Sequence, residues 1–264
     1  NAEAQYDLGF RYATGRGVSQ DDAEALRWWS LAAEQDHEYA TLLGGKYDFG
    51  DGVPQDHAEA VRWYRLAADE GIAAAQFNLG AMYEEGRGVP QDNREAVRWW
   101  RLAADQDFAE AQSDLGRMYA DGRGVQQDDT EAVRWYRLGA EQGDAAAQFH
   151  LGIMHFNGRG VPQDDAESLR WHRLAADQGL ATAQYTLGIM YLAGRGVSQD
   201  DDAAFQWWRL AAEQGHDLSQ AFLGEMYAKG RGVQQDEAEA VRWYRLAAEQ
   251  GDAGGQAQLG LAYS

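Results

Sequence analysis

The 264-residue chain contains no cysteine and few basic side chains, and each shortage excludes a class of protein. Without cysteine it forms no disulfide, thiolate metal site or iron–sulfur cluster, and it has no cysteine nucleophile. No apolar run approaches the roughly 18–20 residues of a membrane span, so we expect no membrane insertion. The 23 Lys and Arg against 43 Asp and Glu give a net charge of −20, which disfavours nucleic acid because phosphate binding needs clustered basic residues.

What the chain has instead is an internal repeat, marked by a Gly-Arg-Gly-Val tetrapeptide, a Leu-Gly pair and a tryptophan that recur in step. The period is 35 or 36 residues. The resulting repeats are 1–36, 37–71, 72–107, 108–143, 144–179, 180–215 and 216–251, with a partial repeat 252–264. Repeat 37–71 is one residue short, and we expect the missing residue to be the Gln found at the matching position elsewhere, such as Gln76.

Each repeat is predicted to form two helices. In the first helix Leu79 and Tyr83 lie at i and i+4 on one face. Gly80 stands inside that helix, and its repetition indicates close helix–helix approach, since an interior Gly costs about 1 kcal/mol against Ala. Gly86 suits a left-handed C-terminal cap. An Asp then begins the second helix with a Glu three residues on, as in a capping box, except at Asp200.

The apolar side chains recur at fixed positions, which indicates packing and not chemistry. Ala60, Trp63 and Ala67 form a stripe for burial on the second helix. The aromatic residue that follows each repeating tryptophan is also expected to be core, although a stacking platform for a ligand is the alternative. All five methionines occupy one repeat position and are expected to form a packing column.

A single helix pair cannot bury its apolar stripe alone, but stacked pairs can, which predicts an all-α solenoid. The pattern Ala-x-Ala-Gln-x-x-Leu-Gly-x-Met-Tyr-x-x-Gly-Arg-Gly-Val, followed by Glu-Ala-x-Arg-Trp-Tyr-Arg-Leu-Ala-Ala, resembles the Sel1-like repeat, which is related to the tetratricopeptide repeat. The resemblance covers essentially all 264 residues. It implies one right-handed α/α superhelix over 1–264 whose first helices line a concave groove.

The resemblance also implies an adaptor or scaffold in bacterial protein complexes. Because the cysteine-rich branch of the family does not match, the compartment stays open between the bacterial cytoplasm and the periplasm or exterior. Neither end carries an obvious polar capping helix, so we expect the chain to be a segment of a longer protein and name self-association through uncapped ends as the alternative role.

Catalytic, metal and cofactor sites are not expected. Gly-x-Gly lacks the strand and third glycine of a nucleotide fingerprint. His150 and His155 are five residues apart, which suits a metal poorly. No Gly-x-Ser-x-Gly or His-Glu-x-x-His occurs, so hydrolysis of a cell-wall or β-lactam-like substrate, proposed for some relatives, lacks residues to carry it. The arginines of Gly-Arg-Gly-Val are expected to pair with nearby acids.

Partner choice should reside in residues that vary at groove positions, which we place five and two residues before and two, five and six residues after each Leu of the Leu-Gly pair. At these positions residues 144–215 supply six apolar or aromatic side chains. The repeats of residues 37–143 supply the charged residues Asp48, Glu84, Glu85, Arg117 and Asp121. This predicts a groove for a protein or peptide that has basic residues. Burial of the same side chains between repeats is the alternative. The predicted groove residues are Phe77, Arg117, Phe149, Ile153, Phe156, Tyr185, Ile189 and Leu192.

Overall fold

The computed structural model describes residues 1–262, which form 15 α-helices and no strand. The chain divides into two compact units, Asn1–Gly139 (unit 1) and Ala140–Ser264 (unit 2). Unit 1 contains α1 (Ala2–Thr14), α2 (Asp22–Gln35), α3 (His37–Phe49), α4 (His57–Asp69), α5 (Ala73–Glu85), α6 (Asn93–Ala104), α7 (Ala109–Asp121) and most of α8 (Asp129–Glu141). Unit 2 contains α9 (Ala145–Asn157), α10 (Asp165–Asp177), α11 (Ala181–Ala193), α12 (Asp201–Glu213), α13 (Asp217–Lys229), α14 (Glu237–Glu249) and α15 (Ala253–Ala262).

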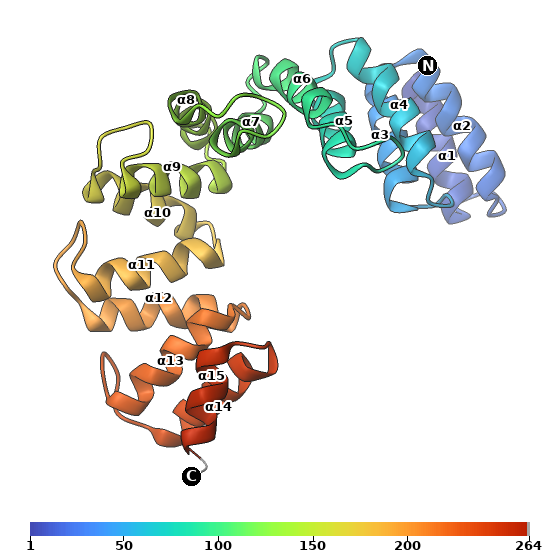
Figure 1. The fold of residues 1–264 in the computed structure, drawn as a ribbon. Helices are drawn as coiled ribbons and strands as arrows, with labels where there is room; N and C mark the ends of the chain where they lie inside the picture. Colours follow the sequence, from blue (N-terminus) through green and yellow to red (C-terminus); the bar gives the residue numbers. More distant parts are fainter. Residues whose placement is uncertain (263–264) are drawn as a thin grey trace. The chain divides into compact units, whose positions relative to one another are not determined.

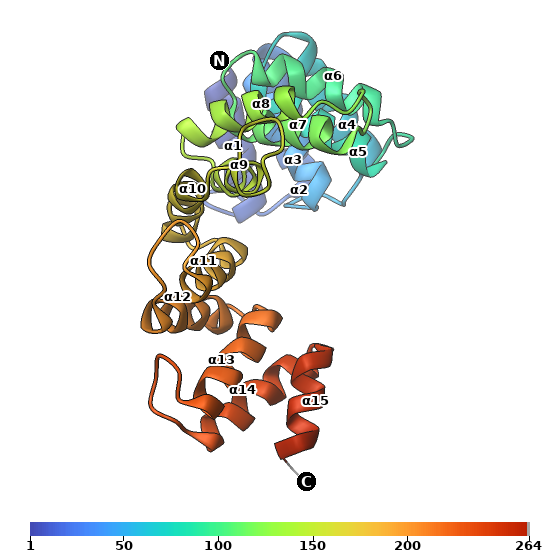
Figure 2. The same cartoon turned by 60° about the vertical axis from the view of Figure 1, so that its left-hand side comes forward.

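Each repeat is a helical hairpin, with an odd-numbered first helix and an even-numbered second helix. Figures 1 and 2 both show α11 and α12 side by side in this way. Within each unit a second helix also packs on the next first helix, as α4 does on α5 and α10 on α11. The predicted all-α solenoid of stacked helix pairs is therefore confirmed within each unit, while its continuity and hand over the whole chain stay predictions.

The second helices begin at the predicted Asp caps. The Asp92 carboxylate accepts hydrogen bonds from the backbone N–H groups of Arg94 and Glu95, at 2.9 and 3.3 Å. The capping box is only half formed, which corrects the sequence-based expectation. The backbone N–H of Asp92 donates to the carbonyl of Tyr83 instead of to Glu95, and Glu95 pairs with Arg98 on the helix surface.

The glycines of Gly-Arg-Gly-Val are required for two different reasons. Gly86 ends α5 in the left-handed conformation, with φ 71°, and its N–H donates to Met82, as predicted. Gly88 has φ 68°, and a Cβ there would collide with the backbone carbonyl of His57 in the preceding repeat. The second glycine therefore lets the loop of one repeat lie directly on the start of the previous second helix.

In the odd-numbered helices from α1 to α13, the interior glycine faces the aromatic ring that follows the repeating tryptophan. A Cβ on Gly80 would lie 2.5 Å from the Trp100 indole nitrogen, and one on Gly116 would lie 2.7 Å from the Tyr136 ring. These rings are buried, with Trp100 at 0% and Tyr136 at 2% exposure. The expected close approach of the helices is confirmed, and so is the core role of the aromatic residue after the tryptophan. Both result from the same contact between the glycine and the buried ring.

The short second repeat loses its residue from the turn and not from the helix. Helix α3 has the full 13 residues, with Ala40 in the register of Gln76. Asp36 alone separates α2 from α3, whereas Glu70, Gly71 and Ile72 separate α4 from α5. The expectation that Gln is the deleted residue is wrong, because a turn can shorten without disturbing the packed faces of the helix.

Candidate functional site

The candidate site is the first-helix face of unit 2, which we define by the six predicted groove residues of α9 and α11. All six are half-buried, which lies between the two sequence-based alternatives of an open groove and full burial. They are Phe149, Ile153, Phe156, Tyr185, Ile189 and Leu192.

The aromatic members of this face rest on the core of unit 2. The Phe149 ring meets the buried His172 edge-on, with ring centroids 5.4 Å apart. Tyr185 stacks on His216 at 4.9 Å and lies 6.0 Å from Phe222 of the next repeat. Each ring is thus supported by protein and keeps part of its surface exposed to solvent.

Two of the apolar residues lie close to a loop arginine, by which we mean the Arg of Gly-Arg-Gly-Val. The Arg195 guanidinium lies 3.6 Å from the centre of the Phe156 ring, while its Nη2 donates to Asp165 at 2.7 Å. Leu192 lines a pocket together with Arg231, which in turn pairs with Asp201 at 2.9 Å. Each loop arginine here bonds to the first residue of the preceding second helix.

The equivalent positions of unit 1 form ionic networks. Arg117, one of the predicted groove residues, donates to both oxygens of Glu84, at 2.8 and 3.0 Å, and pairs with Asp114 at 3.0 Å. Arg123 also reaches Glu84, at 2.9 Å. Burial alone would raise the pKa of Glu84, but its bonds to Arg117 and Arg123 outweigh burial and lower it. Arg117 is therefore engaged within unit 1 and not free for a partner.

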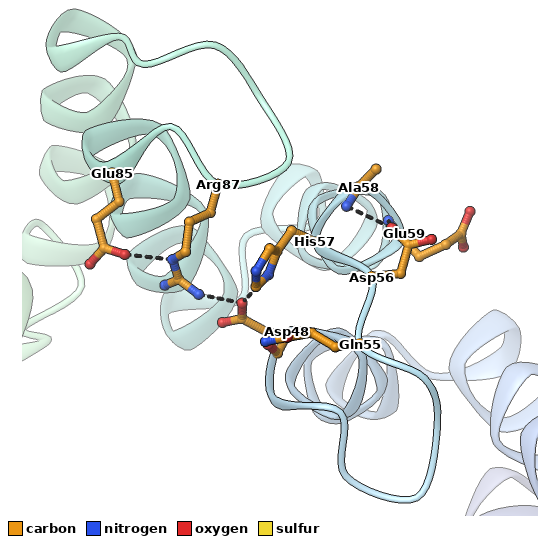
Figure 3. Close-up of polar contacts among 8 residues, drawn as sticks. All are labelled: Asp48, Gln55, Asp56, His57, Ala58, Glu59, Glu85 and Arg87. Atoms are coloured by element: carbon orange, nitrogen blue, oxygen red, sulfur yellow. Dashed lines mark hydrogen bonds and ion pairs between the residues drawn. The ribbon is translucent and has the colours of Figure 1, made fainter.

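A similar network joins the second and third repeats (Figure 3). The Asp48 carboxylate, with a side chain only 5% exposed, pairs with the loop arginine Arg87 and also accepts from His57 Nδ1 at 3.0 Å. Arg87 additionally donates to Glu85 at 2.5 Å. The predicted pairing of loop arginines with nearby acids is thus present, and it crosses from one repeat to the next.

Phe77, the remaining predicted groove residue, lies in unit 1 apart from the six residues of unit 2. It packs against the buried cluster around Trp100, and its ring centroid is 5.2 Å from that of Phe108. Its carbonyl accepts from the Trp100 indole N–H at 3.0 Å. Phe77 is half-buried like the six residues of unit 2, so its place in a partner groove stays a prediction.

The sequence-based reasoning missed Phe222, which stands one residue before the Leu of its repeat. Asp7, Asn78 and Asp114 show that this position is usually polar, so an aromatic residue there was a visible signal. Phe222 stacks on Trp208 with centroids 4.6 Å apart and lines two pockets of unit 2.

His172 of the fifth repeat takes the core position that aromatic residues hold in the other repeats. The His172 ring is fully buried, lies against Gly152 and contacts the Ser168 carbonyl through Nδ1 at 2.8 Å. Burial lowers the pKa of His172 to about 4, so the ring is neutral at pH 7. Among residues 1–262 no group of three or more His, Asp or Glu side chains is placed to hold a metal ion. None of the described helices is long and apolar enough to cross a membrane.

Comparison with known families identifies the chain. The model of the Sel1 repeat matches residues 2–37, 38–72, 73–108, 109–144, 145–180, 181–216 and 217–252. The chain belongs to the Sel1 repeat family. Proteins of this family generally mediate protein–protein interactions and are typically non-enzymatic.

Three solved structures are similar over most of the chain. A Sel1 repeat protein from Oxalobacter formigenes is 38% identical, with a TM-score of 0.89 over 99% of this chain and 76% of that one. A protective antigen of uropathogenic Escherichia coli with an SLR fold is 38% identical, with a TM-score of 0.72, over 100% of this chain and 64% of that one. A Sel1 repeat protein from Klebsiella pneumoniae is 19% identical, with a TM-score of 0.51 over 77% of this chain and 99% of that one, and shows the fold alone. No curated protein sequence matches the chain.

Proposed function

We propose that this chain is a non-enzymatic adaptor that holds a protein or peptide segment on the first-helix face of unit 2. The observation that carries the proposal is the set of six half-buried apolar side chains on two successive first helices. Partly exposed aromatic and aliphatic groups on a rigid support are the usual anchors of protein interfaces.

Charge supports a partner that carries basic residues. The described first helices of unit 2 contain a single Lys or Arg, which is Lys229, whereas Asp217 and Glu225 lie on the same helix. Together with the net charge of −20, this attracts cationic segments and disfavours acidic ones.

The test is a pair of double variants in unit 2. Phe149→Ser with Ile189→Ser should abolish capture of a partner from native lysate. Leu174→Ser with Leu210→Ser is the matched control, because these leucines are 39% and 40% exposed on the second helices, and it should leave capture unchanged. Helical content is measured by far-UV circular dichroism for each variant. Unfolding of the first double variant, or equal capture by both, would contradict the proposal and favour a packing role.

Self-assembly is the second candidate. Val241 of α14 is half-buried, whereas the matching Val97 and Val133 are 5% exposed. A pocket of about 380 Å³ adjoins Val241 and Leu246. Sedimentation velocity over a hundredfold concentration range tests this candidate. Association that Val241→Asp removes would support it, and a monomer throughout would exclude it.

A further inference from the structure

Two neighbouring pockets of unit 2 share the residues Phe222 and Glu225. We call this pair with its two pockets the Phe222–Glu225 site. The smaller pocket has a volume of about 80 Å³ and is lined by Leu192, Trp208, Met226 and Arg231 besides the shared pair. The larger has about 200 Å³ and is lined by Leu218, Ala221, Tyr244, Asp252, Gly254 and Gln258 besides the same pair.

The two pockets differ in chemistry. Leu192, Met226 and the Trp208 ring make the smaller pocket mainly apolar. The larger one combines the aromatic rings of Phe222 and Tyr244 with the carboxylates of Glu225 and Asp252, and no Lys or Arg lines it. A water molecule needs roughly 10–15 Å³ of pocket volume. Each of the two pockets therefore has room for several heavy atoms of a side chain.

The larger pocket is built for a cation with an aliphatic stem. Aromatic faces attract Lys and Arg cations, and carboxylates bond to them directly. Burial raises the pKa of Tyr244, and the negative charge of Glu225 raises it further. The pKa of Tyr185 is likewise raised by burial and then by Asp217 and Asp252, so negative potential extends across this end of unit 2.

The acids of the larger pocket remain available. Glu225 pairs with Lys229, but both side chains are largely solvent-exposed, at 45% and 59%, and such surface pairs are weak. Asp252 precedes α15, and its Oδ1 accepts a hydrogen bond from the backbone N–H of Gly255. Its second carboxylate oxygen has further acceptor capacity.

We propose that the Phe222–Glu225 site binds a peptide segment in which an Arg or Lys stands beside an aliphatic residue. The cationic side chain enters the larger pocket between Glu225 and Asp252, and the aliphatic side chain enters the smaller pocket against Trp208. This assignment rests on the proposed adaptor function and names the class of partner that unit 2 recognises.

The test uses two blocked dipeptides as probes, N-acetyl-leucyl-arginine amide and N-acetyl-leucyl-citrulline amide, which differ in charge but hardly in shape. The readout is the indole N–H resonance of Trp208, which lines the smaller pocket and donates to the Tyr185 carbonyl at 3.0 Å. We expect a saturable shift with the arginine probe at about tenfold lower concentration than with the citrulline probe. Glu225→Gln should erase that difference.

Glu213→Gln is the matched control, because it removes the same charge from an exposed position of α12. It should leave the tenfold preference intact. Equal shifts by both probes, or the same loss in both variants, would overturn the assignment. If the probes fail while capture still depends on Phe149 and Ile189, the adaptor function survives and only this site is wrong. If the probes bind as expected while substitution of Phe149 and Ile189 leaves capture unchanged, the proposal that the whole first-helix face of unit 2 holds the partner is wrong.

Discussion

In unit 1 the loop arginines Arg87 and Arg123 reach acids on the first helix of the preceding repeat, whereas in unit 2 Arg195 and Arg231 reach acids that begin the preceding second helix. The unit 1 acids are Asp48 and Glu84, five residues after the Leu of the Leu-Gly pair. The unit 2 acids are Asp165 and Asp201, which directly follow the capping Asp.

The residue five positions after the Leu and the first residue of the second helix vary together along the chain. Where the second helix begins with His57 or Asn93, the first-helix position carries Asp48 or Glu84. Where it begins with an acid, the first-helix position is apolar. The apolar residues are Ala13, Ala120, Phe156, Leu192 and Ala228. Each of the seven repeats therefore carries one carboxylate at these two positions, and placing it on the second helix frees the first-helix position for Phe156 and Leu192.

The largest expected effect comes from removing the buried acid of unit 1. Asp48→Ala leaves Arg87 and His57 without their carboxylate and should cost about 2–3 kcal/mol, below the roughly 3–5 kcal/mol for a fully buried pair because the Arg87 side chain is 30% exposed. Urea unfolding measures the loss. Asp201→Ala in unit 2 should cost less, since its pair with Arg231 is more exposed.

A second substitution sharpens this comparison. Adding His57→Asp to Asp48→Ala gives the second repeat the arrangement seen in unit 2, and most of the lost stability should return. No recovery would show that the two positions are not interchangeable.

The glycine–aromatic contact, by contrast, is common to both units and should respond equally in both. Gly80→Ala drives a Cβ into Trp100, and Gly188→Ala drives one into Trp208, so each should cost about 2 kcal/mol by overpacking. Hydrogen exchange of each unit's helices localises the effect. Gly45→Ala is the control, since the added Cβ would lie 3.6 Å from the Tyr64 hydroxyl, and it should stabilise α3 by about 0.5–1 kcal/mol.

His172 makes unit 2 acid-sensitive at a position where unit 1 has Trp29, Tyr64, Trp100 and Tyr136. The folded state holds the imidazole neutral with a pKa of about 4, against 6.5 for the free group, so protonation favours the unfolded chain. Stability should fall as the pH drops from about 6.5 towards 4, by about 2 kcal/mol at pH 5 at 1.36 kcal/mol per unit.

The matched variant is Ser168→Ala with His172→Tyr, which restores the pair found at Ala132 and Tyr136. The difference in unfolding free energy between pH 7 and pH 5 should shrink by the amount assigned to His172. An unchanged difference would place the acid sensitivity elsewhere, for example at His216, whose pKa burial also lowers.

The smallest effect should come from the surface arginines that are alike in both units. Arg98 pairs with Glu95 at 3.0 Å and lies 4.8 Å from the Trp99 ring centre, and Arg170 lies 3.9 Å from Trp171. Arg98→Ala and Arg170→Ala should each cost about 0.5–1 kcal/mol, because exposed ion pairs and cation–π contacts are weak. Thermal unfolding with and without 1 M salt checks this, and a loss above 2 kcal/mol would refute it.

Much of the fold could be predicted because the repeat shows each local signal six to eight times. The left-handed glycine at Gly86 and the cap at Asp92 follow from backbone geometry that a few neighbouring residues impose. The candidate site was harder. The position of Phe149 was predictable from its repeat, but its half-burial depends on His172 and the next repeat.

The sequence by itself determined the helical hairpins, their caps and the core positions that recur in every repeat, because these depend on periodicity and on local hydrogen bonding. Only the tertiary structure decided which acid receives each loop arginine and where the pockets beside Phe222 lie. Those contacts join side chains about 30 to 39 residues apart, and their distances are set by how one hairpin packs on the next.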